Sequence, residues 1–345
     1  MSTPSATSST LTTESQCESM ADHSQSMRLI GESLVFIGAE ASLLALIPAP
    51  KADLRLRSTY ESGPTTIDYT EGLDYRFDAA AGTLTRLPGS RLPDFRTNVL
   101  HGREDFDHTQ FPGYGNLPFF AYADYTAETA IHWPQPVADA QSLTATRRKL
   151  AAGLPFTLVA YGDSITFGSE ASAPHLVFWQ RWADALQARH PTARIKTVNA
   201  ATGGDTTTQG LERLNEKILP QQPDLVLIGF GMNDHNRDSV PLLRFKTQLT
   251  EIVTRIHERT GAETLLYSTF PPNPNWRHGS HQMAAYARAT AEVAAATGSA
   301  FVDVYAAWQI FAARKRPEDL LANNINHPND FGHWLYYEAL EELKL

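Results

Sequence analysis

The second half of the chain alternates short apolar runs with longer segments of helical periodicity. The apolar runs are rich in β-branched residues and fall at 156–161, 195–199, 225–229, 264–268 and 300–303. The helical segments lie between them, at about 175–189, 207–218, 240–260 and 281–297. Buried strands separated by helices predict an α/β fold, a three-layer doubly wound parallel sheet. Its binding site is expected at the carboxyl ends of the strands.

The first half follows a different pattern, in which polar and apolar residues alternate with period two. Residues 53–57 and 66–69 alternate in this way, as half-buried strands do. Residues 73–77 and 83–87 flank a short turn and predict a hairpin. We therefore expect a small N-terminal β-sandwich or jelly-roll-like module. A helix at about 139–150 is predicted to link it to the second half.

A long stretch without clear periodicity, residues 88–118, ends the first half. It is rich in proline, glycine and aromatic residues, among them Phe95, Phe106, His108, Phe111 and Tyr114. Long ordered loops in compact proteins often serve binding. The aromatic residues could equally fix the module onto its neighbour, and the sequence leaves both interpretations open.

These patterns divide the chain into three parts. Residues 1–27 are rich in Ser, Thr and Gln and are expected to form a disordered tail. We expect a β-rich accessory module over residues 28–138 and the α/β domain over residues 139–345. Cys17 is the only cysteine, so no intramolecular disulfide can form.

The composition indicates the class of protein and argues against some kinds of binding partner. The chain has 42% hydrophobic residues and 19% charged residues, which is typical of a globular protein with a sizeable core. A net charge of −9 argues against binding to nucleic-acid phosphates. The apolar run 29–47 is interrupted by Glu32 and Glu40, so it is a poor membrane span. No secretory signal is evident, and we expect a cytoplasmic protein. The oligomeric state stays open.

Ser164 is the most suggestive single residue. It follows the apolar run 156–161 and precedes a helical segment. A serine becomes a nucleophile when a base takes its proton, and His327, near the other end of the chain, is a candidate base. A serine at a strand-to-helix turn is also a common helix cap. The surrounding Gly162-Asp163-Ser164 is not the Gly-x-Ser-x-Gly elbow of α/β-hydrolases.

Four sequence blocks, taken in chain order, resemble those of the SGNH (GDSL-type) hydrolases, a family of esterases and acetylesterases. The blocks are 158–166, 203–207, 229–234 and 323–330. The resemblance implies that Ser164 is the nucleophile and His327 the general base. It also implies three oxyanion donors, namely the backbone N–H groups of Ser164 and Gly204 and the side-chain amide of Asn233. Taken singly, the glycine pair is also compatible with a plain turn, and Asn233 with a cap or turn.

The chain departs from the family where an acid should support the histidine. The family has an aspartate three residues before the histidine, and this chain has Asn324 there. We expect Asn324 to orient the imidazole through its amide oxygen. Asp330 is the alternative acid, followed by Asp319, and weak activity is the third outcome. In serine proteases, the corresponding Asp-to-Asn change lowers kcat roughly 10⁴-fold.

Other polar residues near these blocks receive supporting roles. Three aspartates are expected to brace loops by accepting backbone N–H bonds, and they are Asp163, Asp205 and Asp234. We expect no metal and no cofactor, with a metal cluster of Asp163, Asp234 and His327 as the minor alternative. His333 is expected to pack at the start of the last helix rather than act as the base. Trp276 and His278 either line the substrate site or form a surface turn.

The resemblance implies a serine ester hydrolase. Relatives with an N-terminal module are often carbohydrate esterases, so a carbohydrate O-acetylesterase acting on a polysaccharide or small-molecule ester is the first expectation. One alternative is a broad short-chain carboxylesterase or lipase. The other is a carbohydrate-binding protein with weak catalysis, which the amide at position 324 motivates.

Overall fold

The computed structural model of the chain describes residues 26–137 and 142–345. Most of the expected N-terminal tail, residues 1–25, lies outside the described residues, and so does the predicted start of the linking helix at 139–141. The proposed boundary between residues 138 and 139 falls there too and stays a prediction. The linking helix α1 is described over Thr144–Ala151.

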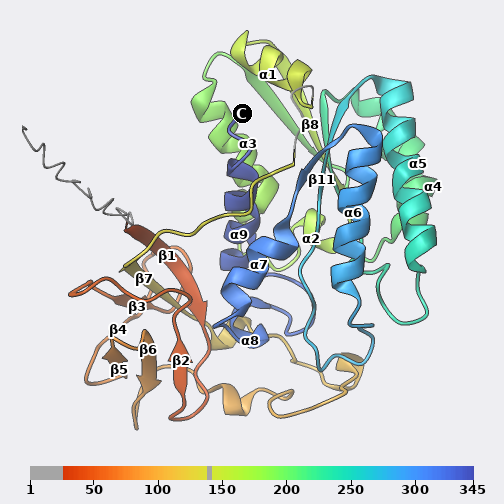
Figure 1. Cartoon of the computed structure of the whole chain (residues 1–345). Helices are drawn as coiled ribbons and strands as arrows, with labels where there is room; N and C mark the ends of the chain where they lie inside the picture. The colour runs from red at the N-terminus through yellow and green to blue at the C-terminus, as the bar shows by residue number, and fades with distance from the viewer. Residues whose placement is uncertain (1–25, 138–141) are drawn as a thin grey trace, which may run out of the picture.

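A five-stranded parallel sheet forms the centre of the larger part of the molecule (Figure 1). Its strands are β8 Pro155–Gly162, β9 Arg194–Asn199, β10 Leu225–Gly229, β11 Glu263–Tyr267 and β12 Ala300–Val302. Every neighbouring pair runs parallel, and each strand lies within a residue or two of its predicted position. The predicted doubly wound α/β fold is confirmed.

Helices cover both faces of this sheet (Figure 1). One layer holds α4 Thr207–Lys217, α5 Leu242–Thr260 and α6 Met283–Thr297. The other holds α3 Phe178–Arg189, α7 Val304–Ala312 and α9 Asp330–Glu341. Two short helices, α2 Ser164–Phe167 and α8 Pro317–Leu320, lie in connecting loops.

The strand order places the candidate residues at one point of the sheet edge. The order is β12-β11-β10-β8-β9, so the chain leaves β8 towards one side and later returns to β10 on its other side. Doubly wound sheets open a crevice where the order reverses in this way, beyond the carboxyl ends of the strands. The loops after β8, β9 and β10 carry Ser164, Gly204 and Asn233.

Two small antiparallel sheets form the N-terminal module, seen at the lower left of Figure 1. The first has the order β1-β7-β3-β4, with bounds Met27–Leu34, Ala121–Ala127, Arg55–Arg57 and Asp68–Tyr69. The second has the order β2-β6-β5, with bounds Ala41–Leu43, Thr83–Arg86 and Tyr75–Asp78. The predicted hairpin is β5–β6. Strand β7, which joins β1 and β3, has no counterpart among the predicted strands.

The irregular stretch after β6 connects the module to the α/β domain. It contains three 3₁₀ turns, η1 Phe95–Thr97, η2 His108–Gln110 and η3 Leu117–Phe119. In Figure 1 it crosses beneath the α/β domain. Leu100 and Phe106 from this stretch form one buried apolar cluster with Trp276 and Ile325. Phe111 and Tyr114 of the same stretch pack against this cluster. The aromatic residues of 88–118 therefore fix the module onto its neighbour, which is one of the two interpretations left open.

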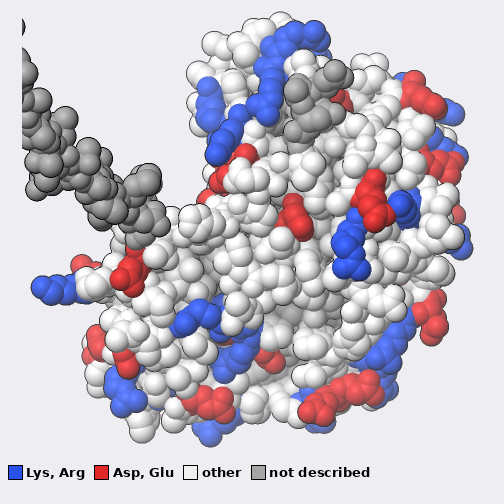
Figure 2. Space-filling view, viewed as in Figure 1, with Lys and Arg blue, Asp and Glu red and all other residues white. Residues whose placement is uncertain are grey.

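Surface charge is mixed on the face shown in Figure 2, where acidic and basic side chains are interspersed. Within residues 26–137 and 142–345, no helix combines the length and the apolar character that crossing a bilayer requires.

Candidate functional site

The end of β8 presents Ser164 through a turn that requires glycine. A Cβ on Gly162 would lie 2.1 Å from the carbonyl oxygen of Gly229, so the backbones of β8 and β10 approach closely here. Asp163 follows, and its side chain accepts the backbone N–H of Ile165 at 2.9 Å. Asp163 is thus the cap of α2. Ser164 occupies the first position of that helix and is not its cap.

His327, near the C-terminal end of the sequence, contacts Ser164. Its Nε2 lies 2.8 Å from the Oγ of Ser164, across a sequence separation of 163 residues. This distance is a hydrogen bond of the kind that joins a nucleophile to its base. Both side chains are largely shielded from solvent.

Backbone hydrogen bonds fix the loop that carries His327. The side-chain oxygen of Asn323 accepts the backbone N–H groups of Ile325, Asn326 and His327 at 3.0, 2.9 and 2.9 Å. The carbonyl of His327 accepts the N–H of Ala322 at 2.9 Å. Asn323 therefore organises the histidine loop, a role that the sequence interpretation did not assign.

Asn324 does not contact the imidazole as expected. Its backbone has a φ of 58°, and its side-chain oxygen accepts a hydrogen bond from Nδ2 of Asn273 at 3.2 Å. Among the described residues, Nδ1 of His327 has no hydrogen-bond partner. The left-handed backbone turns the amide towards Asn273, so this geometry departs from the predicted amide-supported pair.

The two alternative acids also face other groups. Asp330 accepts the backbone N–H of Ser172 at 2.8 Å, and burial raises the pKa of its carboxyl. Asp319 accepts the backbone N–H of Val35 at 2.8 Å. The carboxylate beside His327 is instead Glu170, whose Oε1 lies 3.9 Å from Nδ1. The motif comparison missed Glu170. The available signal was an acidic residue in the loop directly after the serine helix.

The expected oxyanion donors come from the loops beside Ser164. A Cβ on Gly203 would lie 3.9 Å from the Cβ of Ser164, so this loop touches the serine. Gly204 has a φ of 82°, and the space where its Cβ would stand is open. The side-chain amide of Asn233 donates to the carbonyl of Asp205 at 3.0 Å, so Asn233 meets the same loop.

The neighbouring aspartates brace these loops. Asp234 accepts the backbone N–H of Thr207 at 2.9 Å, which ties the loop after β10 to the start of α4. Burial raises the pKa of Asp163 to about 7 and that of Asp234 to about 6. Asp205 lies 3.4 Å from the guanidinium of Arg213. In the part of the chain that the structure describes, no three His, Cys, Asp or Glu residues are grouped so as to hold a metal.

His333 lies inside the protein, at the start of α9. Its ring stacks on Phe178 with centroids 5.9 Å apart, and burial lowers its pKa to about 3. The ring is fully buried, while the hydrogen bond to Ser164 comes from His327. The sequence interpretation also placed His333 in a packing role.

An aromatic cluster, defined as His108, Tyr114, Trp276 and His278, joins the module to the loop after β11. The indole N–H of Trp276 donates to Nδ1 of His108 at 3.1 Å. The His108 ring is 5.2 Å from the Tyr114 ring and 6.3 Å from the His278 ring. Burial raises the pKa of Tyr114, and the charge of Glu170 adds to this effect. Trp276 also packs against Ile325, two residues before His327, so the cluster borders the histidine loop.

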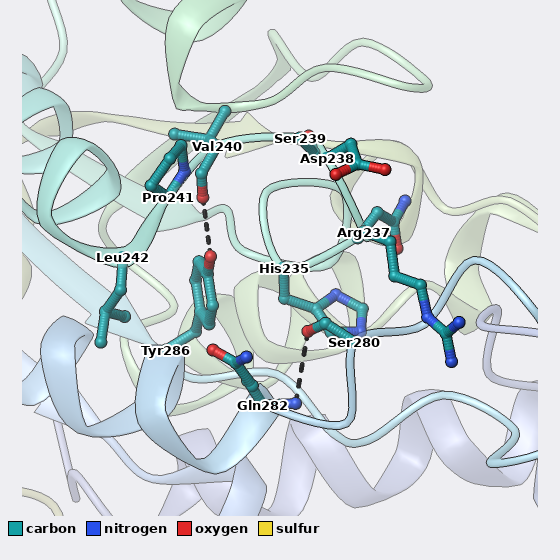
Figure 3. Close-up of a pocket in the computed structure, with 11 residues that line it drawn as sticks. His235, Arg237, Asp238, Ser239, Val240, Pro241, Leu242, Ser280, Gln282 and Tyr286 are labelled. Carbon is teal, nitrogen blue, oxygen red and sulfur yellow. Dashed lines mark hydrogen bonds between the residues drawn. The ribbon is translucent and has the colours of Figure 1, made fainter.

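A separate pocket of about 650 Å³ opens next to the loop that follows Asn233 (Figure 3). His235, Val240 and Tyr286 line it, and the Tyr286 hydroxyl donates to the carbonyl of Val240 at 2.6 Å. Neither Ser164 nor His327 is among the lining residues. Burial lowers the pKa of His235 to about 4, so this imidazole is neutral at neutral pH.

Comparison with known families agrees with this geometry. The sequence model of the GDSL-like Lipase/Acylhydrolase family matches residues 160–335, a span that contains Ser164, Gly204, Asn233 and His327. The chain belongs to this family. It is therefore a hydrolase that acts on carboxylic ester bonds.

Several characterised proteins are similar to the same region. Esterase TesA of Pseudomonas aeruginosa is 30% identical over 151 residues, which is 43% of this chain and 70% of the esterase. An acetylxylan esterase of Geobacillus stearothermophilus is 28% identical over 163 residues, covering 45% of this chain and 74% of that enzyme. Among solved structures, a two-domain esterase (CEX) active on acetylated mannans has 23% identity and a TM-score of 0.48. The match covers 59% of this chain and 53% of that one.

Proposed function

We propose that this member of the family is a carbohydrate O-acetylesterase with a Ser164–His327 pair at its centre. The observation that carries the proposal is the 2.8 Å hydrogen bond between Oγ of Ser164 and Nε2 of His327. The bond joins a weak nucleophile to a base, and it does so beyond the carboxyl end of a parallel strand.

In the first step, Ser164 attacks the ester carbonyl while His327 takes the hydroxyl proton. A tetrahedral intermediate forms, and its oxyanion faces the N–H groups at Ser164 and Gly204 and the amide of Asn233. His327 then gives the proton to the departing sugar oxygen, which leaves as an alcohol. The acetyl group stays on Ser164 as an ester.

In the second step, His327 takes a proton from water, and the resulting nucleophile attacks the acetyl carbonyl. Collapse of the second intermediate releases acetate and returns the proton to Ser164. Removing a donor from an oxyanion site typically lowers kcat about 10²- to 10³-fold. We therefore expect Asn233→Ala to lower kcat on this scale, because it removes the side-chain donor.

Two observations support an acetylated carbohydrate as the substrate. One of the similar proteins is an acetylxylan esterase that shares three quarters of its length with this chain. The aromatic cluster of His108, Tyr114, Trp276 and His278 also borders the site, and His278 is 46% exposed. Flat ring faces combined with polar ring atoms suit the mixed apolar and polar faces of a sugar.

Hydrolysis of p-nitrophenyl acetate tests the chemistry, with the variants Ser164→Ala and His327→Ala. Both are expected to lose nearly all activity while keeping the wild-type unfolding curve. His333→Asn is a comparison variant that alters the second histidine of this region. If Ser164→Ala hydrolysed the ester at the wild-type rate, the proposed nucleophile would be wrong.

The substrate class needs a separate measurement. We expect faster release of acetate from acetylated xylan or mannan, per active site, than release of octanoate from an octanoyl ester. The opposite preference would favour a broad short-chain carboxylesterase, an activity in keeping with the similarity to the esterase TesA. Binding to polysaccharide without hydrolysis by any form of the protein would point to the carbohydrate-binding alternative.

A further inference from the structure

One nitrogen of the His327 ring lacks the partner that a serine hydrolase normally provides. Its Nε2 contacts Ser164, while its buried Nδ1 has no hydrogen-bond partner among the described residues. An imidazole that takes a proton at Nε2 must carry its other hydrogen on Nδ1, and a partner there fixes both tautomer and ring orientation. The three side chains expected to supply this partner are engaged elsewhere.

Glu170 faces this nitrogen. Its Oε1 lies 3.9 Å from Nδ1 of His327, about 1 Å longer than a hydrogen bond. The Glu170 side chain is one-third exposed, so a change of side-chain torsion can close this gap. Catalytic hydrogen bonds are often long in ligand-free structures and tighten in the substrate complex.

The loop that carries Glu170 is held on both sides of this residue. The backbone N–H of Ser169 donates to the carbonyl of Ser164 at 3.0 Å, and that of Ser172 donates to Asp330 at 2.8 Å. Between them, Glu170 adopts a φ of 67°, which is unfavourable for a residue with a Cβ. A strained backbone of this kind persists only where its surroundings impose it. Asp330, expected as an alternative acid, thus holds the loop that presents Glu170.

We infer that Glu170 is the positioning residue of His327, supplying the carboxylate that the family usually places three residues before the histidine. The inference rests on the proposed Ser164–His327 chemistry. In this arrangement, Glu170 accepts the N–H of Nδ1, selects the tautomer with a free Nε2, and stabilises the imidazolium that forms during the attack. The nucleophile and this carboxylate are then only six residues apart, on one loop.

The test compares Glu170→Gln, Glu170→Ala and Glu170→Asp in steady-state hydrolysis of p-nitrophenyl acetate. We expect Glu170→Gln and Glu170→Ala to lower kcat at least about tenfold. Their KM should stay within about twofold of the wild-type value, because Glu170 contacts the base and not the substrate. The roughly 10⁴-fold loss of kcat that follows replacement of the buried aspartate in serine proteases is the upper limit of this effect. Glu170→Asp is expected to recover part of kcat, and added formate should reactivate Glu170→Ala by filling the vacated position.

Glu61→Gln is the matched control. It removes the same charge from a side chain that pairs with His175 at 3.0 Å, and kcat should stay within about twofold of the wild type. If Glu170→Gln kept more than about a third of the wild-type kcat, Glu170 would not position the base. If Glu170→Gln and Glu170→Ala lost activity, but Glu170→Asp and added formate restored none of it, Glu170 would serve only the structure of its loop. Full activity of Ser164→Ala would instead overturn the proposed function.

Discussion

At the scale of single residues, burial controls the protonation of the carboxyl groups beside Ser164. Asp163 lies between β8 and Ser164, and burial raises its pKa to about 7. Its hydrogen bond from Ile165 and the bond from Thr166 oppose this effect but do not offset it. The cap of the serine helix is therefore a carboxyl group that is partly protonated at neutral pH.

This raised pKa predicts how stability depends on pH. An acid with a higher pKa in the folded than in the unfolded state stabilises the fold below its unfolded value, near 3.8, and that contribution is lost as the pH rises through about 7. Relative to Asp163→Asn, the wild type should lose up to about 1.4 kcal/mol per pH unit within this window. Urea unfolding at several pH values between 4 and 7 measures the difference.

A surface aspartate provides the comparison for this measurement. Asp184 is an exposed residue of α3 whose carboxylate accepts a hydrogen bond from Gln180. Asp184→Asn should leave the pH dependence of unfolding close to that of the wild type. If the unfolding free energy of the wild type and of Asp163→Asn changed equally with pH, the assigned protonation of Asp163 would be wrong.

At the scale of elements, the close approach of β8 and β10 sets the position of Ser164. A Cβ at Gly162 would meet the Gly229 carbonyl and Oγ1 of Thr166 at 2.1 and 2.2 Å, and backbone cannot move aside cheaply. Gly162→Ala is expected to cost about 3 kcal/mol or more and to lower kcat. Gly63→Ala, where nothing lies within 4 Å of the new methyl group, should change the unfolding free energy by less than about 1 kcal/mol.

The histidine loop gives a second prediction at this scale. Asn323→Ala removes the acceptor of three backbone N–H groups, so the loop loosens and His327 shifts. A displacement of about 1 Å can cost about 100-fold, and we expect kcat to fall towards that level. Asn323→Asp keeps the acceptor oxygen but loses the hydrogen bond that Nδ2 of Asn323 donates to Oδ1 of Asn326 at 3.0 Å, so it should retain more of the wild-type kcat than Asn323→Ala does. Equal losses in the two variants would show that the three hydrogen bonds are not what places His327.

At the scale of the whole molecule, a buried ion pair links the N-terminal module to the α/β domain. Oε1 of Glu32 in β1 lies 2.9 Å from Nζ of Lys315, which follows α7, and both side chains are fully buried. Glu32 also accepts the hydroxyl of Tyr125 at 2.7 Å and the backbone N–H of Ala45 at 2.9 Å. Charged groups at such depth are tolerated only when they are paired and hydrogen-bonded.

Breaking this pair should destabilise the whole chain. Lys315→Met leaves the Glu32 carboxylate buried without its cation, and we expect a loss of about 3–5 kcal/mol in the free energy of unfolding. The double variant Glu32→Gln with Lys315→Met should cost less than the single variant, because no uncompensated charge remains. Urea denaturation of the three forms measures both values. A cost below about 1 kcal/mol for Lys315→Met would mean that the pair does not hold the two parts together.

Module contacts also reach the loop that carries His327. The side-chain amide of Asn116 donates to the carbonyl of Leu321 at 2.8 Å, and its backbone N–H donates to the carbonyl of Ala322 at 2.6 Å. Ile325 packs in the cluster with Leu100 and Phe106. The module is therefore part of the structure that supports the loop of His327.

Local patterns in the sequence were enough to predict most of the elements. The five strands of the central sheet and the β5–β6 hairpin carry their own apolar periodicity, since each is read within a short window. Strand β7 escaped prediction because Ala121–Ala127 is buried on both sides and shows no alternation. The aromatic residues of 88–118 could not be assigned to packing until Trp276 and Ile325 were seen against them.

The sequence by itself determined the family, the order of the blocks and the strand ends on which Ser164, Gly204 and Asn233 stand. These follow from residue types and spacings within single segments. Only the tertiary structure decided which group faces the second nitrogen of His327. That contact joins the strained loop at Glu170 to the histidine loop, across about 150 residues of chain, and the left-handed turn at Asn324 directs its amide to Asn273 instead. Spacing along the sequence carries no information about such a contact, because the fold creates it.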